Sequence, residues 1–150
     1  MKTNSKESPN IQWLQGVCIV PVNITETTKT EDEISYNWER IDLPDNGTNR
    51  NKTDVQLITE AINSWLNTEK RLRLDAGFLV GEVLFDSDIN ARLAYTELAM
   101  ALQADPTYTT PWKASDGVWV TMDAGLYAQV YAAGKAHIQS VFTWLAEKSE

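Results

Sequence analysis

His137 is the only histidine in this chain of 150 residues, and its chemistry would depend on a second polar partner. A catalytic triad needs a nucleophile and an orienting acid beside the imidazole, and a zinc site needs further His or Cys ligands. Instead, the apolar residues Ala133 and Val141 lie about one helical turn to either side of His137. We therefore expect His137 to pack at the edge of a core and not to catalyse a reaction.

Asp86 and Asp88 are carboxylates one residue apart, a pattern that can bind a divalent cation. A calcium loop also needs a glutamate downstream, and residues 91–94 offer no such ligand. An acidic residue directly before a helix ordinarily caps it, because its side chain accepts hydrogen bonds from free backbone N–H groups. The pair therefore predicts a helix cap and no bound metal.

The glycines and the single cysteine form no ligand-binding motif either. Gly77 and Gly81 lack the lysine and the directly following helix of a phosphate-binding loop. Cys18 lies in an apolar run and is expected to be an inert, buried thiol. Without a triad, a metal-ligand set or a phosphate loop, the sequence predicts that the protein is not an enzyme and binds no cofactor.

Composition limits the possible partners. The net charge is −8, and the basic cluster within residues 69–75 mixes three cations with two acids. A surface that binds phosphates needs undiluted clusters of Lys and Arg, so nucleic-acid binding is not expected. Residues 1–10 are polar, unlike a secretory leader, and no apolar run approaches the length of a membrane span. We expect a soluble protein that is made in the cytoplasm.

Two segments near the N-terminus are expected to be strands. Residues 16–22 are an apolar, β-branched run, which is typical of a strand that is buried on both faces or packed against another chain. Residues 33–43 partly alternate between apolar and polar, which is typical of a half-buried strand. Turn-forming residues then fill 44–53. The sequence predicts an N-terminal β arm or hairpin at 1–43, a linker at 44–53 and a compact domain at 54–150.

The compact domain alternates between helical periodicity and short apolar hairpins. Helices are expected to begin at Thr53, Asp88 and Asp123, each of which can cap a helix N-terminus. Hairpins with glycine in or beside their turns are expected at 78–85 and 112–122. The order helix, hairpin, helix, hairpin, helix predicts an α+β fold.

The six tryptophans are expected either to pack in the core or to form an interaction surface. In the compact domain, burial is the simpler interpretation, and a protein–protein patch stays open because Trp and Tyr are enriched at binding hot spots. In the arm, two strands alone cannot bury such large side chains. We therefore predict that the arm forms a subunit interface. Its candidate residues are Trp13, Val17, Ile19, Val20, Tyr36 and Trp38.

Two glycine-containing hairpins flanking an alanine-rich helix form the most distinctive pattern of the chain. The pattern consists of Arg73, Gly77, Phe78, Gly81, Phe85 and Asp88, then Trp112, Lys113, Asp116, Gly117 and Val120, and finally a helix with His137 and Phe142. Over residues 72–148 it resembles a domain of unknown function found in tail-fibre and neighbouring tail proteins of tailed bacteriophages. That family carries no established catalytic residues, so the resemblance assigns none.

The resemblance implies a structural role in a phage virion. We expect a fibre-associated or baseplate adaptor or attachment subunit of the tail, made in the host cytoplasm. It would act by protein–protein interaction with other tail proteins and form a homo-oligomer within the assembly. The alternative is a tail-fibre assembly chaperone that is not retained in the virion.

Overall fold

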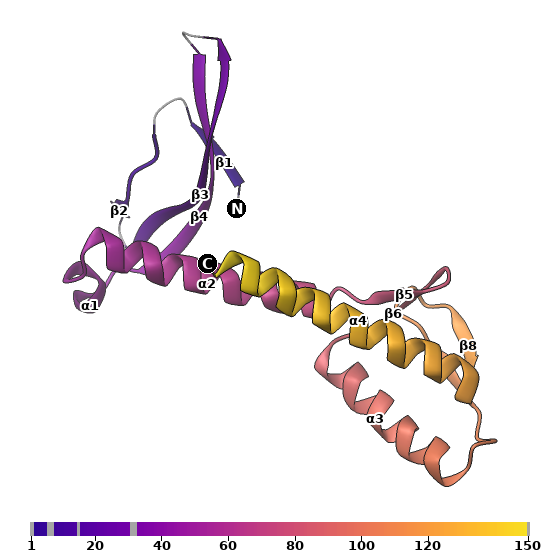
Figure 1. Cartoon of the computed structure of the whole chain (residues 1–150). Helices are drawn as coiled ribbons and strands as arrows, with labels where there is room; N and C mark the ends of the chain where they lie inside the picture. Colours follow the sequence, from indigo (N-terminus) through magenta and orange to yellow (C-terminus); the bar gives the residue numbers. More distant parts are fainter. Residues whose placement is uncertain (1, 6–7, 15, 31–32, 150) are drawn as a thin grey trace. The chain divides into compact units, whose positions relative to one another are not determined.

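The computed structural model describes residues 2–5, 8–14, 16–30 and 33–149 (Figure 1). The chain mixes helix and sheet, as the sequence predicts, with strands towards its N-terminus and helices towards its C-terminus. Its contacts divide it into two compact units, Met1–Asn67 and Thr68–Glu150. Each unit has a hydrophobic cluster of its own.

A four-stranded antiparallel sheet makes up much of the first unit. Its strands are β1 (Lys2–Ser5), β2 (Gln12–Leu14), β3 (Val17–Thr30) and β4 (Glu33–Pro44), in the order β1-β4-β3-β2. β3 and β4 form a long hairpin that runs as far as Thr30 opposite Glu33. The polar composition of residues 25–32 predicts a loop, and residues 31–32 lie outside the described part of the chain. Residues 25–30 are strand instead, because threonine is β-branched and suits a pleated backbone.

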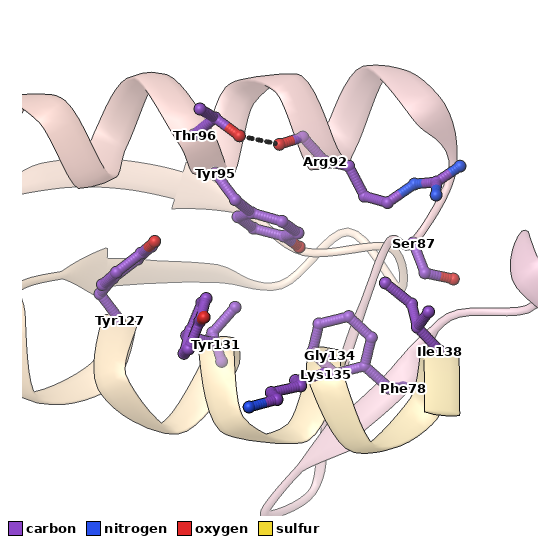
Figure 2. A pocket seen from close by; sticks show the side chains of 11 residues that line it. Phe78, Ser87, Arg92, Tyr95, Thr96, Tyr127, Tyr131, Gly134, Lys135 and Ile138 are labelled. Carbon is purple, nitrogen blue, oxygen red and sulfur yellow. Dashed lines mark hydrogen bonds between the residues drawn. The ribbon is translucent and has the colours of Figure 1, made fainter. Parts of the chain in front are cut away.

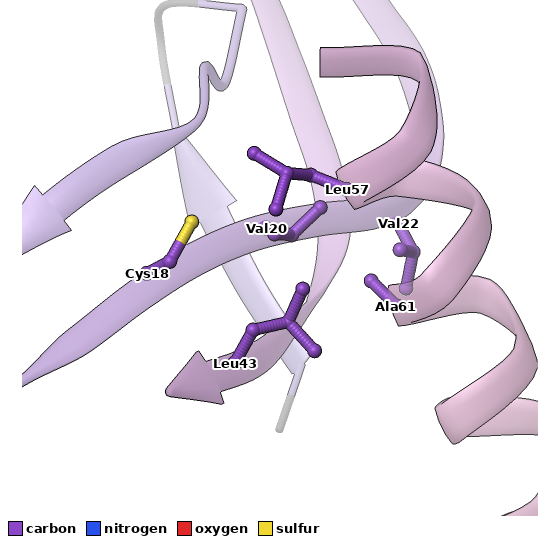
Figure 3. Packing of buried hydrophobic residues seen from close by; sticks show 6 residues of the cluster. All are labelled: Cys18, Val20, Val22, Leu43, Leu57 and Ala61. Carbon is purple, nitrogen blue, oxygen red and sulfur yellow. The ribbon is translucent and has the colours of Figure 1, made fainter. Parts of the chain in front are cut away.

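The core of the first unit lies between this sheet and a helix (Figure 3). Every residue from Cys18 to Val22 is buried, as expected for a strand covered on both faces. On one face, Val20 and its neighbours pack against Leu57 and Ala61 of α2 (Asp54–Leu74). Burial also raises the pKa of the Cys18 thiol, which fits an unreactive side chain.

The compact units do not divide at residues 44–53, where the sequence predicts a linker. This segment contains the short helix α1 (Gly47–Arg50), and the division falls inside α2 instead. The polar side chains that suggest a flexible connection make a defined turn. Asn49 is buried and its side-chain amide donates to the Pro44 carbonyl at 2.8 Å, while its backbone N–H donates to Asn46 Oδ1 at 2.8 Å.

The second unit contains two helices and two hairpins besides the end of α2. Its elements are β5 (Phe78–Val80), β6 (Val83–Phe85), α3 (Ile89–Ala104), β7 (Thr110–Lys113), β8 (Trp119–Met122) and α4 (Ala124–Lys148). Each hairpin is a separate antiparallel pair, and Ser115 N–H donates to the Leu84 carbonyl at 2.9 Å between them. The buried core consists of Phe78, Phe85, Leu98, Leu102, Met122 and Val130.

Three helices begin at the residues that the sequence predicts. Thr53 and Gln56 form a reciprocal capping box at α2, with Gln56 Oε1 accepting from Thr53 N–H at 2.9 Å. Asp88 Oδ1 accepts from Ala91 N–H and Asp123 Oδ1 from Leu126 N–H, each at 2.8 Å. The carboxylate of Asp88 therefore serves as the helix cap that the sequence predicts.

A buried serine links the end of α2 to the start of α3. Ser87 is 3% exposed; its hydroxyl accepts from Gly77 N–H at 2.8 Å and donates to the Leu74 carbonyl. These bonds satisfy backbone groups at the end of α2, where the helix leaves its last carbonyls without intrahelical partners. Ser87 therefore fixes the path of the chain into β5.

Replacing Ser87 with alanine is expected to lower the free energy of unfolding by roughly 1–3 kcal/mol, because two partly buried backbone groups each lose a hydrogen bond. Chemical denaturation followed by circular dichroism measures the change. Ser140→Ala is the matched control, since Ser140 is exposed and donates only to the His137 carbonyl within α4. Equal stability of Ser87→Ala and Ser140→Ala would contradict a linking role for Ser87.

Candidate interaction surfaces

The sheet of the first unit has an edge along β3 that is exposed at residues 23–26. β2 pairs with β3 only at Val17–Ile19. From Val20 to Thr30, β3 has β4 as its single strand neighbour among the described residues. Pro21 lies in this stretch, as suits a residue that cannot donate a ladder hydrogen bond. The pairing shifts between Val22 and Thr25, where Asn23 has a φ of 53°.

Two of the predicted interface residues belong to the core of the chain itself. Val20 is fully buried and Ile19 is 5% exposed, while Val17 is partly buried. The side chains of Ile19 and Val20 are therefore not available to a partner subunit. The apolar run predicts the strand correctly, but it cannot tell whether a helix of the same chain covers it.

Trp13 is held by contacts within the first unit. The guanidinium carbon of Arg50 lies 4.9 Å from the centre of the Trp13 ring, which is a cation–π contact. Arg50 also binds both carboxylate oxygens of Asp45, at 2.6 and 2.7 Å. This hydrogen bonding lowers the pKa of Asp45. Trp13 therefore has an intramolecular partner.

Tyr36 and Trp38 are partly buried on β4, where they pair with Ser5 and Thr3 of β1. The indole N–H of Trp38 is buried and has no hydrogen-bond partner among the described residues. The structure thus brings Tyr36 and Trp38 together on the interior strand β4. Trp13 lies on the edge strand β2, which β3 separates from β4.

The second unit contains an apolar groove between α3 and α4 (Figure 2). Its volume is about 390 Å³. Phe78 and Val130 of the core line its floor, and its walls carry Tyr95 and Thr96 of α3 and Tyr127 and Tyr131 of α4. The sequence does not reveal this groove, because the wall residues come from helices about 30 positions apart.

Cationic and phenolic groups border the groove, and none of the described residues that line it is acidic. Arg92 lies on α3 and Lys135 on α4. Burial, with a smaller effect of Asp86 and Asp88, raises the pKa of Tyr95 to about 12, so this phenol stays neutral at physiological pH. Its hydroxyl donates to the Asp86 carbonyl at 3.0 Å.

The aromatic side chains of the second unit divide between core and surface. Trp112 stacks on Tyr95 with ring centres 5.1 Å apart, and the Arg73 guanidinium carbon lies 4.1 Å above the ring of Trp144. Trp119 differs, because it is 65% exposed on β8. The prediction that the tryptophans of this domain are buried is therefore wrong for Trp119.

His137 is partly buried beside the end of α2. Its Nε2 lies 3.4 Å from the Leu74 carbonyl oxygen and 3.5 Å from the Ser87 hydroxyl, and its ring centre is 6.0 Å from that of Phe78. This is the packing position at a core edge that the sequence predicts. In the part of the chain that the structure describes, no cluster of three or more His, Cys, Asp or Glu residues could hold a metal ion.

Comparison with known proteins identifies one family. Residues 57–149 match the model of a domain of unknown function, DUF4376. The match covers the segment 72–148 in which the two hairpins and the alanine-rich helix lie. No curated protein and no solved structure matches the chain significantly. Among the described helices, none is both long and apolar enough to cross a bilayer.

Proposed function

The chain belongs to the DUF4376 family of domains of unknown function, and we propose that it is a structural subunit of a bacteriophage tail. In this role it is an adaptor or attachment subunit, associated with the fibre or the baseplate, and it acts by binding other tail proteins. Support comes from the residues between Arg73 and Val120, because the order and spacing of the two hairpins there resemble those in phage tail proteins. The matched residues include this segment.

The exposed edge of β3 at residues 23–26, where β4 is the single strand neighbour among the described residues, is the observation that carries the proposal. Unpaired N–H and C=O groups at a sheet edge are a template for another strand, and natural proteins usually cover or disrupt such edges. A strand from a neighbouring subunit could pair here and extend the sheet, an interaction whose affinity comes mainly from backbone hydrogen bonds.

The sequence along this edge suits pairing in an assembly. Val22 is buried and anchors the strand in the core, whereas Ile24 is 45% exposed beside the bulge at Asn23. Val22 thus anchors the strand in the core, and the exposed part of the edge begins directly after it. Four threonines follow at positions 25, 27, 28 and 30 of the sequence, and threonine is a residue type that favours strands.

Two proline substitutions test this edge directly. Thr25 and Glu26 are consecutive on β3, opposite Asn37 and Tyr36. Adjacent residues of an antiparallel strand direct their N–H groups to opposite sides, so proline removes a ladder bond to β4 at one position and an edge donor at the other. The melting temperature distinguishes them, because only loss of the ladder bond should lower it substantially.

We expect the more stable of Thr25→Pro and Glu26→Pro to be incorporated into purified virions at least tenfold less than the unmodified chain. The measurement is quantitative mass spectrometry of particles made by a phage that encodes each variant. Incorporation of this stable variant at the level of the unmodified chain would refute pairing at this edge.

A further inference from the structure

We propose that the groove between α3 and α4 binds an extended acidic segment of a partner protein. One apolar side chain of that segment would lie between the tyrosines, and its carboxylates would lie beside Arg92 and Lys135. This proposal goes beyond strand pairing by the arm and does not depend on it, since no residue of the groove belongs to the first unit.

The apolar part of the groove has the size and lining of a binding site. Its volume of about 390 Å³ is within the usual range of roughly 300–1,000 Å³ for ligand pockets. Gly134 allows the Phe78 ring to approach α4 closely: a Cβ atom at this glycine would lie 3.1 Å from Phe78 Cζ. The ring thereby forms a floor for the groove, and a side chain at position 134 would disturb it.

The charge of the groove is opposite to that of the molecule. The net charge of the chain is −8, yet the charged residues lining the groove are Arg92 and Lys135. Neither forms an ion pair with a carboxylate among the described residues. Elsewhere Arg40, Arg50 and Arg73 do have acidic partners. The groove is thus left with cationic groups whose natural complement is an acidic ligand.

The positions of the two cations favour a polypeptide over a single small anion. Arg92 and Lys135 come from opposite walls, and Figure 2 shows their charged ends pointing in different directions. One phosphate or carboxylate between them would not explain both. A segment that crosses the groove can offer two carboxylates at separate positions and an apolar side chain between them.

Nuclear magnetic resonance of the full, ¹⁵N-labelled chain tests the proposal with three capped peptides. The first has one phenylalanine flanked on each side by three aspartates; the second replaces the aspartates by lysines, and the third replaces the phenylalanine by glycine. We expect the first peptide at millimolar concentration to shift the amide signals of Thr96, Tyr131 and Lys135. The second should leave them unchanged, and the third should bind at least fivefold more weakly.

Variants then assign the charge contacts. Arg92→Gln and Lys135→Gln should each weaken binding of the first peptide roughly two- to fivefold, as expected for exposed ion pairs. Lys113→Gln, at an exposed position on β7 outside the groove, should have no effect. The double variant Arg92→Glu, Lys135→Glu should reverse the preference in favour of the lysine peptide.

Three outcomes would overturn the proposal. No shifts at the groove with the aspartate peptide would exclude an acidic occupant. Equal shifts with the aspartate and lysine peptides would indicate unspecific apolar binding. Groove signals that depend on protein concentration alone would assign the surface to a second copy of the chain. Since all three readouts use the unmodified protein, they remain decisive even if a variant fails to fold.

Discussion

Alanine in place of Phe85 is expected to destabilise the second unit by about 3–5 kcal/mol, which is the usual range for removing a buried phenylalanine. Phe85 is fully buried, and its ring stacks on that of Phe78 with centres 6.2 Å apart. It lies at the end of β6, where the hairpin meets the core shared with Leu98 of α3 and Val130 of α4. A cavity at this point would weaken the packing of both helices.

Hydrogen exchange and denaturant unfolding measure the effect of Phe85→Ala, with exchange showing whether α3 and α4 lose protection. Leu79→Ala is the matched control, because Leu79 lies on the same hairpin and is 62% exposed. We expect that control to change stability by less than about 0.5 kcal/mol. A similar loss of stability in the two variants would show that Phe85 is not central to the core.

Alanine at Gly77 is expected to destabilise the same unit by roughly 2–4 kcal/mol, from two separate causes. Gly77 has a φ of +80°, which is unfavourable for any residue with a Cβ atom. A Cβ atom there would also lie 2.7 Å from the Phe85 carbonyl oxygen and 3.2 Å from Leu84 Cδ1. Because the carbonyl belongs to the backbone of β6, relief requires a shift of the hairpin.

Gly81→Ala separates these two causes. Gly81 also has a positive φ, +62°, but a Cβ atom there would meet no atom within 4 Å. We therefore expect Gly81→Ala to cost only the backbone strain, about 1–2 kcal/mol. Thermal unfolding of both variants gives the difference. If Gly81→Ala were as harmful as Gly77→Ala, the close approach of Gly77 to β6 would not determine the hairpin position.

Local signals in the sequence predict where three helices begin and where one of them ends. Thr53, Asp88 and Asp123 cap helices because their short side chains reach free N–H groups one turn ahead, and this depends on neighbours in sequence only. Gly77 ends its helix region for an equally local reason, its positive φ. Such features need no knowledge of the tertiary structure.

Contacts between distant residues account for what the sequence does not predict. Polar residues at 44–53 suggest a linker, but Leu57 and Ala61 beyond it pack on β3, so the first unit extends to Asn67. The same packing buries Val20, whose apolar character is equally compatible with an interface. Only the partner of a side chain, which may lie anywhere in the sequence, distinguishes core from interface.

The groove is invisible in the sequence for a similar reason. Tyr127 and Tyr131 are four residues apart on α4, a spacing that indicates one helical face and nothing about what faces it. Arg92 becomes relevant only when α3 is placed opposite α4. The two cations that line the groove, Arg92 and Lys135, come from helices that are far apart in the sequence. The periodicity of each helix alone does not indicate that these helices face each other.

Mass spectrometry of purified virions tests the proposed role in the tail most directly. A phage that encodes this chain is purified away from the lysate, and peptides of the chain are quantified in both fractions. A structural tail subunit should be present in the particles in constant ratio to other tail proteins. Detection in the infected lysate together with absence from the particles would contradict the proposal and support an assembly chaperone that is released.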